Sequence, residues 1–489
     1  MLERLAPQVK TQETQSLGSD DCEIGFALSD EKEHVMLSRP TRCICIRILE
    51  FAALVLFSSL FLAWLALSST RTTGAPFPAA SPLSVDVDHL WAQYSPYFPV
   101  AKYKPLPRGC KVSQVNIIQR HGSRFPTLGA GVAIQVSLAR LLRARNFTDP
   151  RLAFLANYTY ELGQDDLVAL GASESFSAGA LQFERYRDIV RHGNLPFVRA
   201  SSSKRVVESA TNWTAGFASA SNEMFKPKVS LILLEYLNDT LTNKMCPNAG
   251  NANEQTHHWQ SIFARPIVHR LNQAAPGANL VDIDIPYLMS LCPFETVAKR
   301  TKSHFCDLFT QQEFEAFEYY GDLNKFYGFG YGQTLGRVQG VGYVNELLAR
   351  LTGKPVQDHT QTNRTLDSSP VTFPLNRSIY VDFSHDNTMV AIYAALGLFQ
   401  QPKHLDPAHP DPDRTWMVSR MVPFSGRMVT EKVQCSGKTD QFVRILVNDA
   451  VEPLEFCGGK HGLCELDAFV QSQGYARSDG AGDFEKCFA

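Results

Sequence analysis

Four short apolar runs, separated by long stretches with helical patterns, constrain the fold of this chain more than any other feature. Each run has the length and apolar content of a buried strand. Helical patterns lie between them, for example at 347–351 and 387–398. Strands that alternate with helical stretches predict an α/β protein whose sheet contains parallel pairs. The four runs are 112–118, 197–201, 378–383 and 442–447.

The middle of the chain is longer than crossover helices between these strands require. Two stretches, about 128–195 and 240–345, account for the excess and predict a smaller, mainly helical subdomain inserted on the sheet. No repeat or low-complexity block interrupts residues 89–489, and 44% of the chain is hydrophobic, which is ample for a large core. We therefore expect 89–489 to form one large domain.

An uncharged stretch near the N-terminus has the length of a membrane span. Residues 51–70 contain 20 residues without a charge, enough to cross about 30 Å of hydrocarbon. Arg39, Arg42 and Arg47 precede it and only Arg71 follows closely, which places the N-terminus in the cytosol. The pattern predicts a type II single-pass signal anchor at 47–70.

The segments on either side of this span fit the same arrangement. Residues 1–46 are polar and poor in aromatics, which predicts a disordered cytosolic tail, and 71–88 are rich in Ser, Thr and Pro, as in a stalk. A cleaved signal peptide is the alternative, but its polar leader would be about twice the usual 15–30 residues of a whole signal peptide. Later cleavage, which releases a secreted form, remains open.

Sequons and cysteines indicate that the chain beyond the span is extracellular or lumenal. Eight cysteines follow the span, and an even number in an oxidising compartment predicts four disulfides. A formal charge of −2 gives no reason to expect nucleic acid as a partner. All six N-x-S/T sequons also follow the span, and they begin at Asn146, Asn157, Asn212, Asn238, Asn363 and Asn376.

The strand at 112–118 leads into a loop, "QRHGSRFP", that carries two arginines around a histidine. Ligands of open α/β sheets bind at the carboxyl ends of strands, where this loop lies. Arg120 and Arg124 would hold a tetrahedral dianion, and neighbouring cations favour the neutral, nucleophilic form of His121. We expect Gly122 to permit a tight turn. The loop therefore predicts a phosphate-accepting histidine.

A second Arg-His-Gly tripeptide, at 191–193, lacks this context. It follows a polar helical pattern rather than a strand, and no second arginine comes after it. The pattern predicts a solvated helix end without a catalytic role.

Two further segments complete the predicted site. The strand at 378–383 leads to His385 and Asp386 and then to a helix, which places both side chains at the same sheet edge. Asp386 is a candidate proton donor to a departing alkoxide, and His385 a candidate phosphate ligand. Arg205, near a helix start after the strand at 197–201, would clamp the transferred phosphoryl group.

These motifs resemble the signatures of the histidine acid phosphatases. "RHGSRFP" is similar to the family's R-H-G-x-R-x-P motif and "SHD" to its downstream His-Asp motif. Further segments, among them "HLWAQYSPYF", "YLMSLCPFET" and "LGRVQGVGYVNELLARLT", resemble the fungal phytases (3-phytase type) over roughly residues 89–489. The resemblance implies a phosphoglycerate-mutase-like, doubly wound α/β sheet with an inserted helical subdomain.

The resemblance also implies residue roles and an activity. His121 would become a phosphohistidine, Asp386 would donate the proton, and Arg120, Arg124, Arg205 and His385 would hold phosphate. No cofactor or metal is implied, and a monomer is expected. The implied inositol-phosphate ligands are Gln93, Tyr94, Thr127 and Lys325. The implied disulfides are Cys110–Cys435, Cys246–Cys487, Cys292–Cys306 and Cys457–Cys464.

The departures from the family pattern concern the substrate. The segment after the signature, "LGAGVA", contains no lysine, Asn324-Lys325 stands where relatives carry a lysine pair, and Ser290 replaces an acidic residue. Fewer cations at the mouth of the site should weaken the preference for a highly phosphorylated ring. We therefore expect hydrolysis of phytate at acidic pH, with a broad acid phosphatase as the alternative and a silent binding protein or a mutase as lesser ones.

Overall fold

The computed structural model describes residues 86–437 and 440–489. Its strands form one eight-stranded sheet, and all four predicted runs are strands of it. The strands are β1 Cys110–Arg120, β2 Phe197–Ser201, β3 Val229–Leu233, β4 Ile379–Ser384, β5 Arg427–Cys435, β6 Gln441–Val447, β7 Ala450–Val451 and β8 Cys464–Glu465.

The sheet is parallel in one half and antiparallel in the other. Its order is β3-β2-β4-β1-β5-β6-β7, with β8 paired to β6. The pairs β3–β2, β2–β4 and β4–β1 are parallel, as the strand–helix alternation predicts. The strands β5, β6 and β7 follow one another closely in sequence and pair antiparallel, because short connections cannot make a parallel crossover. The pairs β1–β5 and β6–β8 are also antiparallel.

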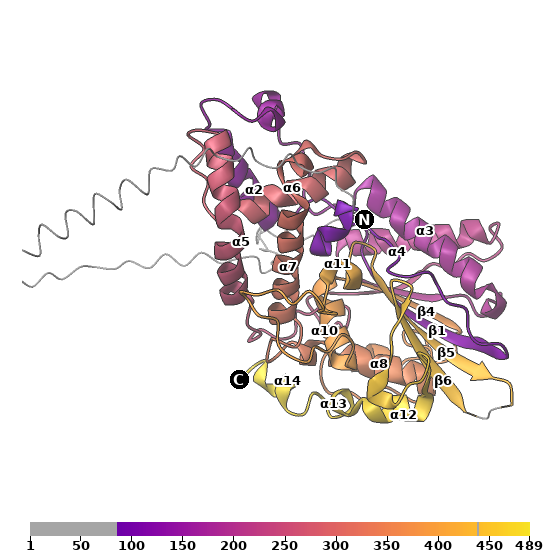
Figure 1. Cartoon of the computed structure of the whole chain (residues 1–489). Helices are drawn as coiled ribbons and strands as arrows, with labels where there is room; N and C mark the ends of the chain where they lie inside the picture. Colours follow the sequence, from indigo (N-terminus) through magenta and orange to yellow (C-terminus); the bar gives the residue numbers. More distant parts are fainter. Residues whose placement is uncertain (1–85, 438–439) are drawn as a thin grey trace, which may run out of the picture. The chain divides into compact units, whose positions relative to one another are not determined.

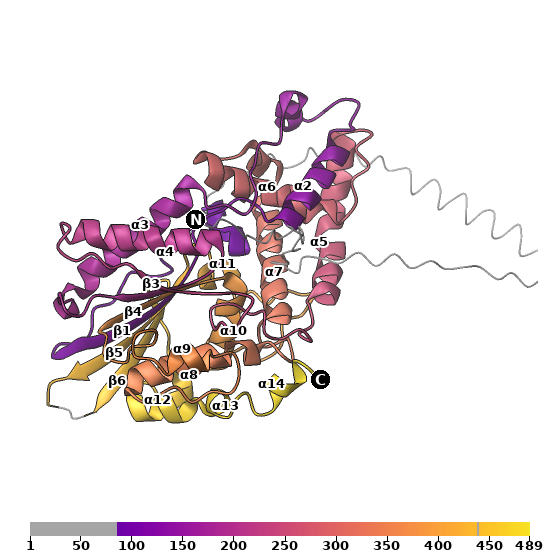
Figure 2. The same cartoon turned by 180° about the vertical axis from the view of Figure 1, so that it is seen from behind.

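Helices cover both faces of the sheet, with α3 and α4 on one face and α8 and α12 on the other (Figures 1 and 2). The longer helices are α2 Leu128–Leu141, α3 Ala169–Tyr186, α4 Lys204–Ala220, α5 Asn253–Ala274, α6 Asp284–Lys299, α7 Gln311–Gly328, α8 Val341–Thr352 and α10 Asp386–Leu396. The shorter ones are α9 Arg364–Asp367, α11 Val418–Met421, α12 Leu466–Ser472, α13 Gly474–Arg477 and α14 Asp483–Lys486.

The core under α3 and α4 shows how the helical stretches divide. Phe183 of α3 and Trp213 of α4 are buried in one apolar cluster with Val381 of the central strand β4. Helices α2, α5, α6 and α7 instead lie together beside the sheet (Figure 1). The predicted stretch 128–195 therefore contains helices of both groups, because α3 packs on the sheet. The division of 89–489 into two subdomains stays a prediction.

All four implied disulfides are present, and they are Cys110–Cys435, Cys246–Cys487, Cys292–Cys306 and Cys457–Cys464. The first joins β1 to β5 at a point where Cys110 and Cys435 are directly paired residues of the two strands. Disulfides persist in oxidising compartments, so this set agrees with an extracellular or lumenal domain.

The predicted tail 1–46, anchor 47–70 and most of the stalk 71–88 lie outside the described residues. Within 86–437 and 440–489, no helix combines the length and apolar character needed to cross a bilayer.

Candidate active site

The register of two parallel strands brings the two predicted motifs together. Arg120, the last residue of β1, is paired with Ser384, the last residue of β4. The next residues are His121 and His385, and the backbone N–H of His121 donates to the carbonyl of Ser384 at 3.1 Å. The two imidazole rings have centroids 5.8 Å apart. The carboxyl edge of the sheet therefore carries both motifs, as the sequence predicts.

The surroundings of His121 set its tautomer and its charge. Its Nδ1 lies 2.9 Å from the carbonyl oxygen of Gly122, and because a carbonyl only accepts, Nδ1 carries the hydrogen and Nε2 the lone pair. Burial lowers the pKa of His121 well below its usual value, and the nearby arginines, led by Arg120 and then Arg205, lower it further. Both effects favour the neutral form of the His121 imidazole.

Arg120 and Lys325 hold the carboxylate of Asp386, the first residue of α10. Nη2 of Arg120 lies 3.2 Å and Nζ of Lys325 3.1 Å from Oδ2 of Asp386. Burial alone would raise the pKa of Asp386, but these two cations outweigh it and keep the pKa well below its usual value. Lys325 also donates to Asn387 at 2.6 Å. Arg120 and Lys325 therefore favour the carboxylate form of Asp386.

Arg124 and Arg205 line a cleft of about 330 Å³ together with His121, His385 and Asp386. Arg205 is the second residue of α4, as predicted, and its Nη1 lies 3.6 Å from Asp165. The other described lining residues are mostly small or polar, and they are Thr242, Asn243, Lys244, Cys246, Ala249, Gly250, Asn251, Ala252, Asn324, Gly328, Phe329, Gln339 and Asn387. An arginine-lined cleft beside a neutral imidazole suits a phosphoryl group.

The loop that carries His121 is fixed by groups that the sequence did not indicate. Glu174 of α3 accepts hydrogen bonds from the backbone N–H of Ser123 at 2.8 Å and from its hydroxyl at 3.0 Å. The N–H of Gly122 donates to the hydroxyl of Ser209 at 3.0 Å. Through these hydrogen bonds, α3 and α4, the two helices that cover one sheet face, hold the backbone of the loop in place.

The reason for a glycine at position 122 differs from the prediction of a tight turn. The φ angle of Gly122 is not positive, so residues other than glycine can adopt its backbone conformation. A Cβ there would lie 2.3 Å from the carbonyl oxygen of Gly171. Glycine is needed because α3 approaches the loop backbone closely.

A carboxylate and a lysine extend the site beyond His385. Oε1 of Glu235 accepts a hydrogen bond from Nε2 of His385 at 2.9 Å, and Oε2 lies 2.9 Å from Nζ of Lys244. Ser203 donates to the same carboxylate through its hydroxyl at 2.7 Å. Burial alone would raise the pKa of Glu235, but its contacts with His385, Ser203 and Lys244 outweigh burial and lower the pKa. Glu235 is therefore ionised and fixes the orientation of the His385 ring.

The structure gives three of the four implied substrate ligands other local contacts. The carbonyl oxygen of Gln93 accepts from Arg120, and the ring of Tyr94 packs 4.7 Å from that of Phe294. Thr127 caps the N-terminus of α2 and lines a separate cavity. The described residues that line the cleft do not include these three or Lys325. Their roles toward substrate stay predictions.

The second Arg-His-Gly tripeptide, at 191–193, is exposed and does not line the cleft. Among the sequons, Asn146, Asn157, Asn238 and Asn376 are exposed, whereas Asn212 and Asn363 are half-buried. The side chain of Asn363 caps α9 by accepting from the N–H of Leu366. Glycosylation at the six positions stays a prediction.

Sequence reasoning missed Glu235, Lys244 and Glu174. Glu235 had a usable signal, because it stands just after the apolar run that forms β3, at the same sheet edge as the other motifs. Glu174 and Lys244 had none. Glu174 lies on a helix distant in sequence from the loop it holds, and Lys244 stands in an irregular segment whose place depends on tertiary contacts.

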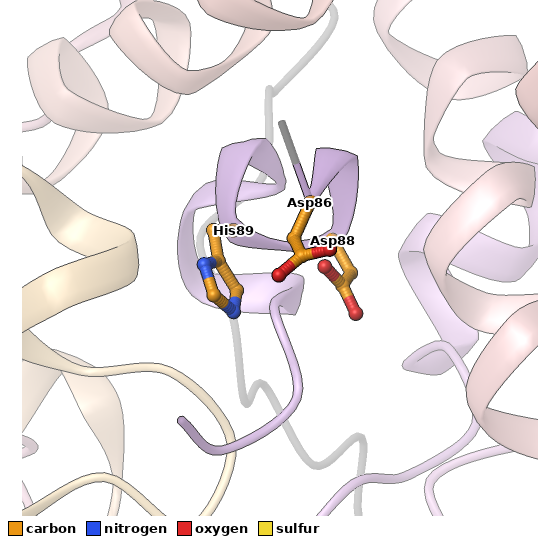
Figure 3. Close-up of side chains that lie close together, drawn as sticks. All are labelled: Asp86, Asp88 and His89. Carbon is orange, nitrogen blue, oxygen red and sulfur yellow. The ribbon is translucent and has the colours of Figure 1, made fainter. Parts of the chain in front are cut away.

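Within 86–437 and 440–489, one group of side chains is close enough to hold a metal ion. The ligand atoms of Asp86, Asp88 and His89 all lie within 4.8 Å of one another (Figure 3). The ring of His89 stacks on Phe98 with centroids 3.6 Å apart. None of the three lines the cleft, so the group has no place in the chemistry of His121.

A buried histidine and several arginines at the carboxyl edge of an α/β sheet define a phosphoryl-transfer protein of the phosphohistidine type. Residues 111–448 match the histidine phosphatase superfamily (branch 2), and the chain belongs to this family. Two similar curated proteins are Phytase A of Emericella nidulans, 39% identical over 82% of this chain and 91% of that protein, and Phytase A of Aspergillus fumigatus, 38% identical over 86% and 97%.

Solved structures share the fold. The crystal structure of the phytase from D. castellii has a TM-score of 0.70 and 22% identity, over 86% of this chain and 91% of that one. The apo form of the multiple inositol polyphosphate phosphatase of Bifidobacterium longum has a TM-score of 0.59 and 15% identity, over 78% and 96%. The α/β fold of this family is therefore that of the present chain.

Proposed function

We propose that this chain is a phosphomonoesterase that hydrolyses phytate (myo-inositol hexakisphosphate) through a phosphohistidine on His121. The observation that carries the proposal is the buried His121 ring, whose Nδ1–H is held by a carbonyl so that the Nε2 lone pair is left beside Arg124 and Arg205. The similarity to proteins named Phytase A supports the substrate.

In the first half-reaction, Nε2 of His121 attacks the phosphorus of the bound ester. The N–P bond forms as the bond between phosphorus and the ester oxygen of the inositol ring breaks, and Asp386 gives its proton to that departing oxygen. The arginines of the loop and Arg205 stabilise the charge on the three other oxygens. The product alcohol leaves and the phosphoryl group stays on nitrogen.

In the second half-reaction, the carboxylate of Asp386 takes a proton from water as the water oxygen attacks phosphorus. The N–P bond breaks, inorganic phosphate is released and His121 recovers its lone pair. Asp386 thus returns to the acid form that the next cycle needs.

Because Arg120 and Lys325 favour the carboxylate form of Asp386, a bound substrate has to raise the pKa of Asp386 before this group can donate a proton. A bound phosphate brings negative charge next to the carboxylate and satisfies the arginines that otherwise lower its pKa. Both effects raise the pKa of Asp386. Activity should therefore favour acidic pH, where the carboxyl is protonated while His121, with its lowered pKa, remains neutral.

Phosphate release by the purified full-length chain tests the proposal. With EDTA present, we expect release from phytate at acidic pH and its loss in His121→Ala. Release from an aryl phosphate alone would replace phytate by simple phosphomonoesters and leave the mechanism in place. Release from neither ester, or a rate that rises toward pH 8, would refute the proposed enzyme.

We also infer where the enzyme acts. The disulfides support an extracellular or lumenal catalytic domain, and the uncharged residues 51–70 support a type II anchor at 47–70, which can be cut to release a secreted form. Protease protection of the intact chain in sealed membranes tests this topology, and a catalytic domain digested only after the membranes are opened is the expected result.

A further inference from the structure

One wall of the cleft is an irregular segment whose place the sequence did not reveal. We call residues 242–252 the outer wall; eight of its residues, from Thr242 to Ala252, line the cleft. Lys244 is its single charged residue. The side chain of Lys244 is 35% exposed, so its ammonium group reaches both the solvent-filled cleft and the buried Glu235.

The carboxylate of Glu235 lies between Lys244 and His385, which is beside His121. Glu235 contacts His385 through one oxygen and Lys244 through the other, each at 2.9 Å. Lys244 lines the cleft and its side chain is 35% exposed, so an anion bound in the cleft can contact its ammonium group while Lys244 keeps its contact with Glu235.

The charge of the cleft favours a substrate with more than one phosphate. Three cations, Arg124, Arg205 and Lys244, line it among the described residues, against the single carboxylate of Asp386. The two arginines lie close enough to His121 for their positive charges to lower its pKa. Lys244 stands on the outer wall and contacts Glu235, so we expect its charge to serve a part of the cleft away from His121.

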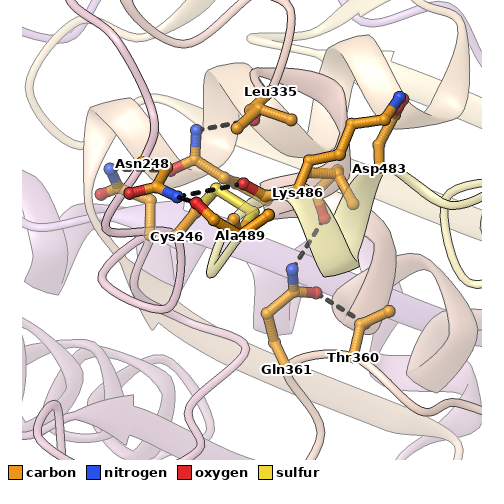
Figure 4. Close-up of a disulfide and its surroundings, with 12 residues drawn as sticks. Cys246, Asn248, Leu335, Thr360, Gln361, Asp483, Lys486 and Ala489 are labelled. Atoms are coloured by element: carbon orange, nitrogen blue, oxygen red, sulfur yellow. Dashed lines mark hydrogen bonds and ion pairs between the residues drawn. A yellow bond between two sulfur atoms is a disulfide. The ribbon is translucent and has the colours of Figure 1, made fainter.

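The outer wall is held firmly at both sides of Lys244. On one side, the hydroxyl of Ser384 donates to the carbonyl of Leu241 at 2.7 Å. On the other, Cys246 is bonded to Cys487, and the amide of Asn248 donates to the carbonyl of Ala489 at 2.7 Å (Figure 4). Because the backbone of this segment is already fixed, a residue on it loses little backbone conformational entropy when it binds substrate.

We propose that Lys244 is a specificity-determining residue that binds a phosphate group of the substrate other than the one transferred to His121. The inference rests on the proposed function and names the class of substrate it selects, a ring with several phosphates. It also offsets the shortage of lysines that the sequence shows after the signature motif, because Lys244 supplies a cation from a different part of the chain.

Lys244→Met tests the proposal, since it removes the charge and keeps the length of the side chain. Lys226→Met is the matched control, because Lys226 is also ion-paired, to Glu223 at 3.1 Å, but is 62% exposed and outside the cleft. The readouts are KM and kcat for phytate and for an aryl phosphate, and the inhibition constants of inositol hexasulfate, which cannot react, and of inorganic phosphate.

We expect Lys244→Met to raise the KM for phytate and the inhibition constant of the hexasulfate by about three- to tenfold, the range for a half-exposed charged contact. The changes for the aryl ester and inorganic phosphate should be clearly smaller than those for phytate and the hexasulfate, and all values of Lys226→Met should stay within about twofold. Lys244→Arg should restore hexasulfate binding.

Two results would overturn the assignment of Lys244. Unchanged hexasulfate binding would show that Lys244 contacts no second anion. Equal losses on phytate and on the aryl ester would show that Lys244 acts only through Glu235 and His385. A wild-type enzyme that releases phosphate from the aryl ester alone refutes phytate as substrate, and the hexasulfate constant then still decides the role of Lys244 by itself.

Discussion

Replacing Glu235 by glutamine tests whether a residue outside the sequence motifs holds the catalytic geometry. The buried carboxylate fixes His385 at 2.9 Å, and a hydrogen bond between such partners contributes about 1.5–3 kcal/mol. The side-chain amide of the Glu235→Gln variant would keep one acceptor oxygen but lose the charge. We expect a loss of about 1.5–2 kcal/mol in transition-state stabilisation, which corresponds to a fall of about 10–30-fold in kcat/KM.

The pattern across substrates and pH distinguishes this role from that of Lys244. In the proposed mechanism His385 binds the phosphate that is transferred, so Glu235→Gln should reduce kcat/KM equally for phytate and an aryl phosphate. Because its partners lower the pKa of Glu235, the carboxylate stays ionised as pH falls below 4.5, and its contribution is lost only when pH reaches the lowered folded-state pKa. The ratio of variant to wild type should therefore stay constant through mildly acidic pH.

The matched control for Glu235→Gln is Asp239→Asn. Asp239 accepts from the same hydroxyl of Ser201 as Glu235 does, at 2.9 Å, but has no bond to His385. Burial raises its pKa to about 6, so the neutral amide resembles the form present in acid. Steady-state phosphate release is the assay. A Glu235→Gln enzyme within twofold of wild type, or a control that loses as much, would refute the reasoning.

Three other changes test separate parts of the structure. Gly122→Ala should destabilise the fold by about 1–3 kcal/mol and reduce phosphate release, because its Cβ would meet the carbonyl of Gly171 at 2.3 Å, whereas Gly129→Ala, with open space, should be neutral in thermal unfolding. Burial raises the pKa of Glu452 from 4.5 to about 7, so the folded protein binds a proton that the unfolded chain loses, and stability should fall by about 3 kcal/mol between pH 4 and pH 8. Glu452→Gln should reduce the fall in stability between pH 4 and pH 8 by that amount in denaturant titrations, and an unchanged fall would contradict the assignment. Loss of the Cys246–Cys487 disulfide in a double Cys→Ser variant should cost about 2–5 kcal/mol and raise the KM for phytate, and a lower melting temperature with an unchanged KM would disprove its role in the cleft.

The sequence by itself determined four of the eight strands and the motifs that carry the proposed reacting groups. Apolar runs such as 197–201 match β2 residue for residue, because a buried strand needs a short continuous apolar segment. The motifs that follow two of these runs place His121, His385 and Asp386 at one sheet edge, since parallel strands end on the same side. Resemblance to the family supplied the four disulfide pairings, which spacing alone leaves open.

Only the tertiary structure decided what surrounds these groups. Glu174 is distant in sequence from the loop that it holds, and Lys244 stands in an irregular segment that carries no local pattern of side chains to indicate its contacts. The requirement for glycine at position 122 arises from the approach of Gly171, not from its own φ. The outer wall reaches the cleft because Cys246 is bonded to Cys487, 241 residues later in the chain. Local sequence specifies a residue's chemistry and secondary structure, whereas packing between distant segments specifies its partners.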